Sequence, residues 1–269
     1  FMNNLKKTVE AAVNIIGDIP YKQYTFIGIG PGRGGIEHLN NTTVSFDGNE
    51  LNKPGAMNRV LNFLAHEYFH HYNVKRIRPF ELGPFDYDKG NRTNLLWISE
   101  GLSVYYEYLV VKRAGLADAA ILFSNFNGNL NNNENNPGRL HQSLQQASYR
   151  TWSDGPFGSQ GDEKGKTISY YDKGPLVGML FDFAIRNATE NKKSLDDVMR
   201  LLYWKYYKEK YVYSTKELDY AKYLGYAGLK IDKQSIEPKE KGTTQKFSIS
   251  KIDAPTPLQI AILKSWLGE

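Results

Sequence analysis

Three of the five histidines of this 269-residue chain fall within six residues, in the string Leu64-Ala65-His66-Glu67-Tyr68-Phe69-His70-His71. Apolar side chains recur at helical spacing over residues 56–74, so we expect a helix there. Residues four apart share one face of a helix, and His66 and His70 can therefore direct one ring nitrogen each at the same ion. This spacing predicts half of a metal site on one helix.

Glu67 follows the first of these histidines and is rotated by about 100° around the helix axis. It is poorly placed to bind the same ion, but it can reach a water held by that ion and accept its proton. The same pattern also arises by chance, when two histidines happen to lie on an amphipathic helix. His71 points to another face, where it either supports a ligand or lies on the surface.

A catalytic metal site needs a third protein ligand and an open position for water. The next expected helix, at about 94–114, offers Glu100 in an apolar and aromatic stretch, where an unpaired carboxylate would be costly. Glu107 lies two turns further on and could accept a hydrogen bond from a metal-binding histidine. Each glutamate also has an ordinary interpretation, as a salt-bridged, surface or solvated helix residue.

Composition limits the chemistry that is available to the chain. It contains no cysteine, which excludes disulfides, thiolate metal ligands and a cysteine nucleophile. Any metal must therefore be held by histidines and carboxylates. The net charge of +5 is a mild basic excess that does not require a nucleic-acid partner. No run of about 18 apolar residues occurs, so we expect no membrane span.

Apolar spacing and turn residues predict the order of elements along the chain. We expect helices at 3–16, 56–74, 94–114, 139–150, 174–188, 194–208, 215–226 and 257–267, and strands at 24–29, 36–46 and 247–252. The stretch 124–138 is rich in asparagine and glycine and is expected to be an exposed loop. The lysine-rich stretch 231–246 is expected to be a linker. The predicted fold class is α+β, mainly α.

Several strings resemble the glycyl aminopeptidase family of zinc metallopeptidases, which belongs to the gluzincins. They are His66-Glu67-Tyr68-Phe69-His70, Asn73-Val74-Lys75-Arg76-Ile77-Arg78-Pro79, Pro84-Phe85-Asp86-Tyr87, Leu96-Trp97-Ile98-Ser99-Glu100-Gly101 and Tyr170-Tyr171-Asp172-Lys173-Gly174. Together they cover roughly residues 25–230, and the Asn73–Pro79 string makes the match specific. The resemblance implies one Zn²⁺ per chain, bound by His66, His70 and Glu100, with Glu67 as the general base.

The resemblance also implies a domain organisation. Residues 1–230 would form a thermolysin-like catalytic domain, with a small N-terminal β-sheet in a lobe that ends near residue 115 and a helical C-terminal lobe after it. Residues 231–269 would form the linker, a strand and a helix. Members of the family usually carry an N-terminal β-rich domain and a PDZ domain, and neither is visible in the sequence. We infer a truncated chain or a natural variant without the PDZ domain.

Likeness to the related aminopeptidase N group implies two further sites. Gly34-Gly35-Ile36-Glu37-His38 is similar to that group's Gly-Ala-Met-Glu-Asn strand, whose glutamate binds the free α-amine of the substrate. Glu37 is the corresponding candidate here, and His38 replaces the asparagine. Tyr171-Asp172-Lys173-Gly174 is similar to that group's Tyr-Glu-Lys-Gly, in which the tyrosine hydroxyl donates to the oxyanion. Tyr171 is the candidate, Tyr170 is the alternative, and packing is the ordinary role of either ring.

These expectations describe a zinc metallopeptidase that acts on peptide substrates. An anchored amino terminus near the metal would make it an aminopeptidase, and the family name implies small first residues such as glycine or alanine. Two alternatives stay open, namely an endopeptidase of the same fold and a catalytically inactive, metal-stabilised binding module. Family habit and the lack of cysteine favour an exported, periplasmic or extracellular protein.

Overall fold

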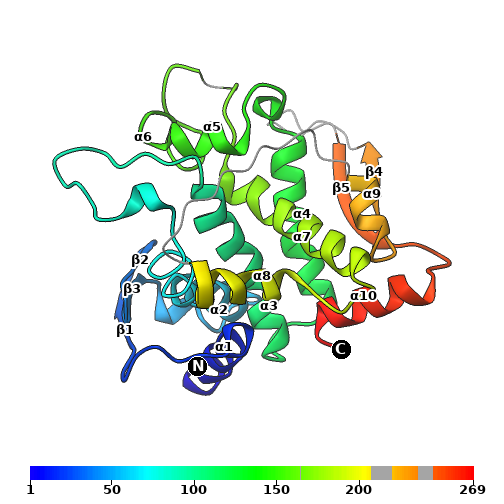
Figure 1. Cartoon of the computed structure of the whole chain (residues 1–269), viewed down its shortest axis with the longest axis horizontal. Helices are drawn as coiled ribbons and strands as arrows, with labels where there is room; N and C mark the ends of the chain where they lie inside the picture. Colours follow the sequence, from blue (N-terminus) through cyan, green and yellow to red (C-terminus); the bar gives the residue numbers. More distant parts are fainter. Residues whose placement is uncertain (164, 207–219, 236–244) are drawn as a thin grey trace. The chain divides into compact units, whose positions relative to one another are not determined.

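The computed structural model describes residues 1–163, 165–206, 220–235 and 245–269 (Figure 1). Its chain divides into two compact units. The first contains Phe1–Arg78, Tyr106–Leu122 and the described residues from Asp196 to 206. The second contains Pro79–Tyr105, Phe123–Leu195 and the described residues from Tyr220 onward. The domain boundaries that we expected near 115 and 230 stay predictions.

The first unit combines helices with a small mixed sheet. Its elements are α1 (Met2–Ile16), β1 (Thr25–Ile29), β2 (Gly35–Glu37), β3 (Asn41–Ser45), the 3₁₀ turn η1 (Gly48–Glu50), α2 (Ala56–Phe69), most of α3 (Leu102–Arg113) and most of α8 (Leu195–Leu201) with the π-helical turn η5 (Leu202–Tyr206). The strand order is β1-β3-β2. β3 runs parallel to β1 and antiparallel to β2, so β2 lies at one edge of the sheet.

The sheet of the first unit packs against α2, as Figure 1 shows for the blue and light-blue elements at the lower left. Leu5 of α1, Val44 of β3 and Leu64 of α2 are buried together and join the three elements. α1 ends at Gly17, which adopts a left-handed conformation with φ 80 that a glycine tolerates without strain. The expected single strand at 36–46 is wrong, because the chain turns back between β2 and β3.

The second unit is mainly helical. Its elements are the 3₁₀ turn η2 (Phe80–Leu82), the π-helical turn η3 (Trp97–Gly101), most of α4 (Ala119–Glu134), the 3₁₀ turn η4 (Pro137–Leu140), α5 (Leu144–Tyr149), α6 (Thr151–Asp154), α7 (Tyr170–Ala188), α9 (Tyr220–Gly225), β4 (Leu229–Ser235), β5 (Gln245–Lys251) and α10 (Pro257–Leu267). β4 and β5 pair antiparallel in a two-stranded sheet. The expected linker at 231–246 is therefore wrong for its described ends, because β4 and β5 occupy them.

The asparagine-rich stretch 124–138 is mostly helix α4 instead of the exposed loop that its composition predicted. Asn127 Oδ1 accepts from the backbone N–H of Ile249 at 2.6 Å. One turn later, Asn131 pairs with both the N–H and the carbonyl of Phe247. Asparagines spaced by four residues thus satisfy alternate backbone groups of strand β5, which is paired with β4 on its other side. The asparagine-rich pattern therefore marks the side of α4 that binds strand β5, and it does not mark a turn.

The remaining elements agree with the expected order, with shifted ends. The predicted helix at 94–114 is η3 followed by α3, and the predicted helix at 56–74 ends at Phe69. Part of the helices expected at 194–208 and 215–226 lies outside the described residues. Within the described parts of the chain, no helix is both long enough and apolar enough to cross a membrane.

Candidate metal and catalytic centre

The two histidines of the central motif face one another at the end of α2. His66 lies in the last turn of the helix, and His70 caps it, with its backbone N–H donating to the carbonyl of His66. Both side chains are buried, and their Nε2 atoms lie 2.9 Å apart. The helical spacing therefore brings both ring nitrogens to one point, as the sequence predicted.

The far nitrogen of each ring is held by an acceptor. Nδ1 of His70 lies 3.1 Å from the backbone carbonyl of Asn73, and Nδ1 of His66 lies 2.9 Å from Oε2 of Glu107. Each Nδ1 then carries the ring hydrogen, so both Nε2 atoms present lone pairs. Two lone pairs repel across 2.9 Å unless a cation or a proton lies between them. This arrangement fits a metal ion bound by the two Nε2 atoms.

Glu107 is therefore found where the sequence suggested, beside a candidate metal ligand. Its side chain is largely buried. Burial raises the pKa of Glu107 above its ordinary value. The hydrogen bond to His66 and the positive charges of His66 and His70 oppose this rise. The carboxylate orients the His66 ring, which is the role that carboxylates commonly have behind a metal-binding histidine.

Glu67 is buried next to His66 and lies against strand β2. A Cβ atom at Gly35 would stand 2.7 Å from Oε1 of Glu67 and 2.8 Å from Cζ of Phe63. Only a residue without a side chain leaves room for the carboxylate at this point. The sequence placed Gly35 in the turn before the strand expected at 36–46, and this role was missed because the contact joins residues that are 32 positions apart.

Glu100 lies in η3, a single π-helical turn that precedes α3. Such turns are uncommon and occur frequently at functional sites. Gly101 follows Glu100 and packs against Gly174 of α7, where a Cβ on Gly101 would stand 2.6 Å from the Cα of Gly174. The glycines of the Ser-Glu-Gly and Asp-Lys-Gly strings are therefore the contact point of η3 and α7, which sequence reasoning did not foresee.

Within the described residues, His66, His70 and Glu100 form a group that could hold one metal ion. Each offers one ligand atom, and these atoms lie within 4.8 Å of one another. The donor set is two imidazoles and one carboxylate, which suits zinc and leaves a position open. The same three residues were suggested as ligands by the sequence, and their binding of a metal stays a prediction.

The two candidate tyrosines begin helix α7. The hydroxyl of Tyr170 lies 2.9 Å from Oγ1 of Thr151. Burial raises the pKa of Tyr170 to about 12, the bond to Thr151 opposes this rise, and the charge of Glu100 adds to it. Tyr171 is half-buried, and its ring centroid lies 5.1 Å from that of Tyr170 and 5.3 Å from that of Phe157. The hydroxyl of Tyr170 is thus occupied, and the role of Tyr171 stays a prediction.

Glu37 lies in edge strand β2, and its Oε1 atom forms a salt bridge of 2.8 Å with Nζ of Lys75. Burial is the largest cause that raises the pKa of Tyr24, and the charges of Glu67 and Glu37 raise it further. Both carboxylates are therefore close enough to act on one hydroxyl. His38 is exposed directly after Glu37. The amine-binding role of Glu37 and the contribution of His38 stay predictions.

His71 is fully buried and does not lie on the surface. Its Nδ1 atom pairs with the carbonyl of Tyr68, and its ring packs against Tyr21, Tyr24 and Tyr72. Burial lowers the pKa of His71 to about 3, so the ring is neutral at physiological pH. The ring is thus part of a buried cluster of aromatic side chains.

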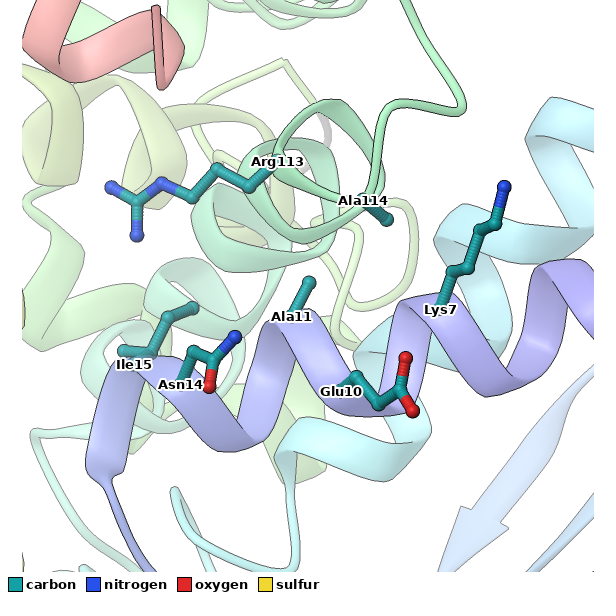
Figure 2. A pocket seen from close by; sticks show the side chains of 7 residues that line it. All are labelled: Lys7, Glu10, Ala11, Asn14, Ile15, Arg113 and Ala114. Atoms are coloured by element: carbon teal, nitrogen blue, oxygen red, sulfur yellow. The ribbon is translucent and has the colours of Figure 1, made fainter.

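A separate cavity of about 490 Å³ lies between α1 and the end of α3 (Figure 2). Its lining residues are Lys7, Glu10, Ala11, Asn14, Ile15, Arg113 and Ala114. Arg113 also forms a salt bridge of 2.8 Å with Asp196. None of the candidate site residues lines this cavity, so it plays no part in the chemistry considered below.

Residues 59–177 match the family of M61 glycyl aminopeptidases. This segment is similar to the M61 family. The matched segment contains the motif histidines, Glu67, Glu100, Glu107 and both candidate tyrosines, whereas Glu37 precedes it. M61 is a family of peptidases, so the resemblance noted in the sequence is confirmed for this segment.

A solved structure is similar to this chain in its fold. An aminopeptidase N family protein from Idiomarina loihiensis is similar with a TM-score of 0.77 and 22% sequence identity. The match covers 87% of this chain and 45% of that chain, so this chain spans less than half the length of the similar protein. The predicted fold class, α+β and mainly α, is confirmed. No curated protein matches the chain in sequence.

Proposed function

We propose that this chain is a zinc-dependent aminopeptidase that removes small first residues, such as glycine or alanine, from peptides. The observation that carries the proposal is the facing pair of Nε2 atoms on His66 and His70, with both Nδ1 atoms held by acceptors. Glu100 supplies the third ligand. Three protein ligands are typical of catalytic zinc sites, whereas structural sites are closed by a fourth. The ligand set therefore favours an enzyme over a metal-stabilised binding module.

A zinc ion bound by these residues would supply a Lewis acid that polarises the scissile carbonyl and acidifies water. The other steps belong to the chain's own side chains. Glu67 accepts a proton from the attacking water and later donates it to the leaving amine. Tyr171 donates a hydrogen bond to the oxyanion that develops on the carbonyl. Tyr170 is the weaker choice, because its hydroxyl is already paired with Thr151.

In this proposal, strand β2 selects substrates that have a free amino terminus. Glu37 presents a half-buried carboxylate, which pairs with the α-ammonium group of a substrate. Gly35 lies two residues earlier and against Glu67, so the same short strand joins the amine-binding residue to the general base. A chain end held at Glu37 leaves room for few residues before the scissile bond. The preference for glycine or alanine rests on the family description.

A panel of glycyl, alanyl and leucyl reporter substrates, each with a free or an acetylated amino terminus, tests this function. We expect hydrolysis of the free glycyl and alanyl substrates and little hydrolysis of the acetylated ones. Glu67→Gln should lower kcat by about a hundredfold or more, because it removes the base while keeping the side-chain volume. The exposed Glu10→Gln is the matched control.

Two results would contradict parts of the proposed function. Equal hydrolysis of acetylated and free substrates would identify an endopeptidase and remove the amine-binding role of Glu37. Unchanged hydrolysis in Glu67→Gln would show that another group is the base.

A further inference from the structure

The carboxylate of Glu37 already has a cationic partner in the folded chain. Nζ of Lys75 lies 2.8 Å from Oε1 of Glu37, and the two side chains are 19% and 22% exposed. A pair that is largely withdrawn from water is screened less than a surface pair. Any ammonium group that approaches Glu37 therefore meets the charge of Lys75 at short range.

Lys75 is held in place by the turn that follows α2. Its backbone N–H donates to the carbonyl of His70 at 3.0 Å. The carbonyl of Asn73, two residues earlier, is the group that orients the His70 ring. The turn thus orients the ring of His70, a candidate metal ligand. The same turn places the ammonium group of Lys75 against strand β2. The position of Lys75 is consequently tied to the candidate centre.

We propose that Lys75 is a specificity-determining residue that competes with the amino terminus of the substrate for Glu37. The salt bridge engages Oε1, and Oε2 can accept from a second ammonium group. The incoming ammonium group gains the attraction of Glu37 but is repelled by the like charge of Lys75. Lys75 therefore orients the carboxylate and at the same time weakens the binding of every free amino terminus. This inference rests on the proposed function.

The substitution Lys75→Met tests the competition, because it keeps much of the side-chain volume and removes the charge. We expect KM for a free glycyl substrate to fall about threefold to tenfold, with kcat nearly unchanged. Lys75→Arg keeps the charge and should leave KM close to that of the unchanged chain. Lys53→Met removes an exposed salt bridge to Glu50 and serves as the matched control.

Binding measured by calorimetry gives a second readout that does not depend on turnover. In the Glu67→Gln background, Lys75→Met should tighten the binding of triglycine by a similar factor and leave acetyl-triglycine unchanged. Unchanged or weaker binding of triglycine would overturn the inference, and so would equal tightening for both peptides. A failure of the proposed function is distinguishable, because the unchanged chain would then hydrolyse nothing or would hydrolyse free and acetylated substrates equally, while the binding comparison still reports on Lys75.

Discussion

Gly35 of β2 lies so close to Glu67 of α2 that a Cβ atom at position 35 would stand 2.7 Å from the carboxylate oxygen Oε1. Gly35→Ala must therefore displace Glu67 or shift the strand. We expect kcat for a glycyl substrate to fall about tenfold to a hundredfold, because a misplaced base transfers protons poorly. Gly28→Ala in β1 meets nothing within 4 Å and should leave kcat unchanged. Full activity in Gly35→Ala would show that the carboxylate tolerates displacement.

The approach of Gly101 to Gly174 predicts a loss of stability. In Gly101→Ala the new Cβ would lie 2.6 Å from the Cα of Gly174, so η3 and α7 must separate. We expect the free energy of unfolding to fall by about 1–3 kcal/mol, the usual cost of overpacking. Gly128→Ala on α4 has open space and should be neutral or slightly stabilising. Denaturant unfolding of both variants gives the comparison, and equal stability would refute the close contact.

Glu107→Gln tests the carboxylate behind His66. The amide can still accept from Nδ1 of His66, but it lacks the negative charge that makes the ring a better ligand. We expect zinc affinity, measured by competition with a chelator, to fall about tenfold to a hundredfold. Glu10→Gln on the surface of α1 is the control. Wild-type affinity in Glu107→Gln would mean that the contact with His66 does not support metal binding.

Asp172 gives a prediction about pH. Burial raises its pKa, and hydrogen bonds from Asn132 and Asn129 oppose this rise. With the folded pKa above the unfolded value of about 3.9, the unfolded chain binds fewer protons, so this carboxyl lowers stability as pH rises through that region. Asp172→Asn should therefore raise the melting temperature at pH 7, and the gain should disappear below about pH 4.

The exposed Asp162→Asn is the control for this substitution and should leave the melting temperature nearly unchanged at both pH values. A gain in Asp172→Asn that is larger at pH 4 than at pH 7 would contradict the direction of the shift.

The spacing of residues along the chain predicted those features that depend on a single helix or strand. The helices α1 and α10 and the facing of His66 and His70 follow from residues that are three and four positions apart. Glu100 was predicted as a metal ligand because an unpaired carboxylate in an apolar helix is costly. These features needed no knowledge of distant parts of the chain.

Contacts between distant residues were not predictable in the same way. The asparagines of α4 bond to a strand more than 110 positions away, and composition alone favoured a loop. The glycines at 35, 101 and 174 are required by close approaches that only the folded chain reveals. The salt bridge between Glu37 and Lys75 belongs to the same class, because the strand pattern showed the carboxylate but not its partner.

The central claim is that His66, His70 and Glu100 hold one zinc ion while Glu67 acts on the substrate without binding the ion. Elemental analysis after zinc reconstitution, performed with the hydrolysis assay, tests it most directly. We expect about one zinc ion per chain both in the unchanged protein and in Glu67→Gln, which should be inactive, and loss of zinc and activity together in His70→Ala. Less than about half an equivalent of zinc in the unchanged protein, or full zinc content in His70→Ala, would contradict the claim.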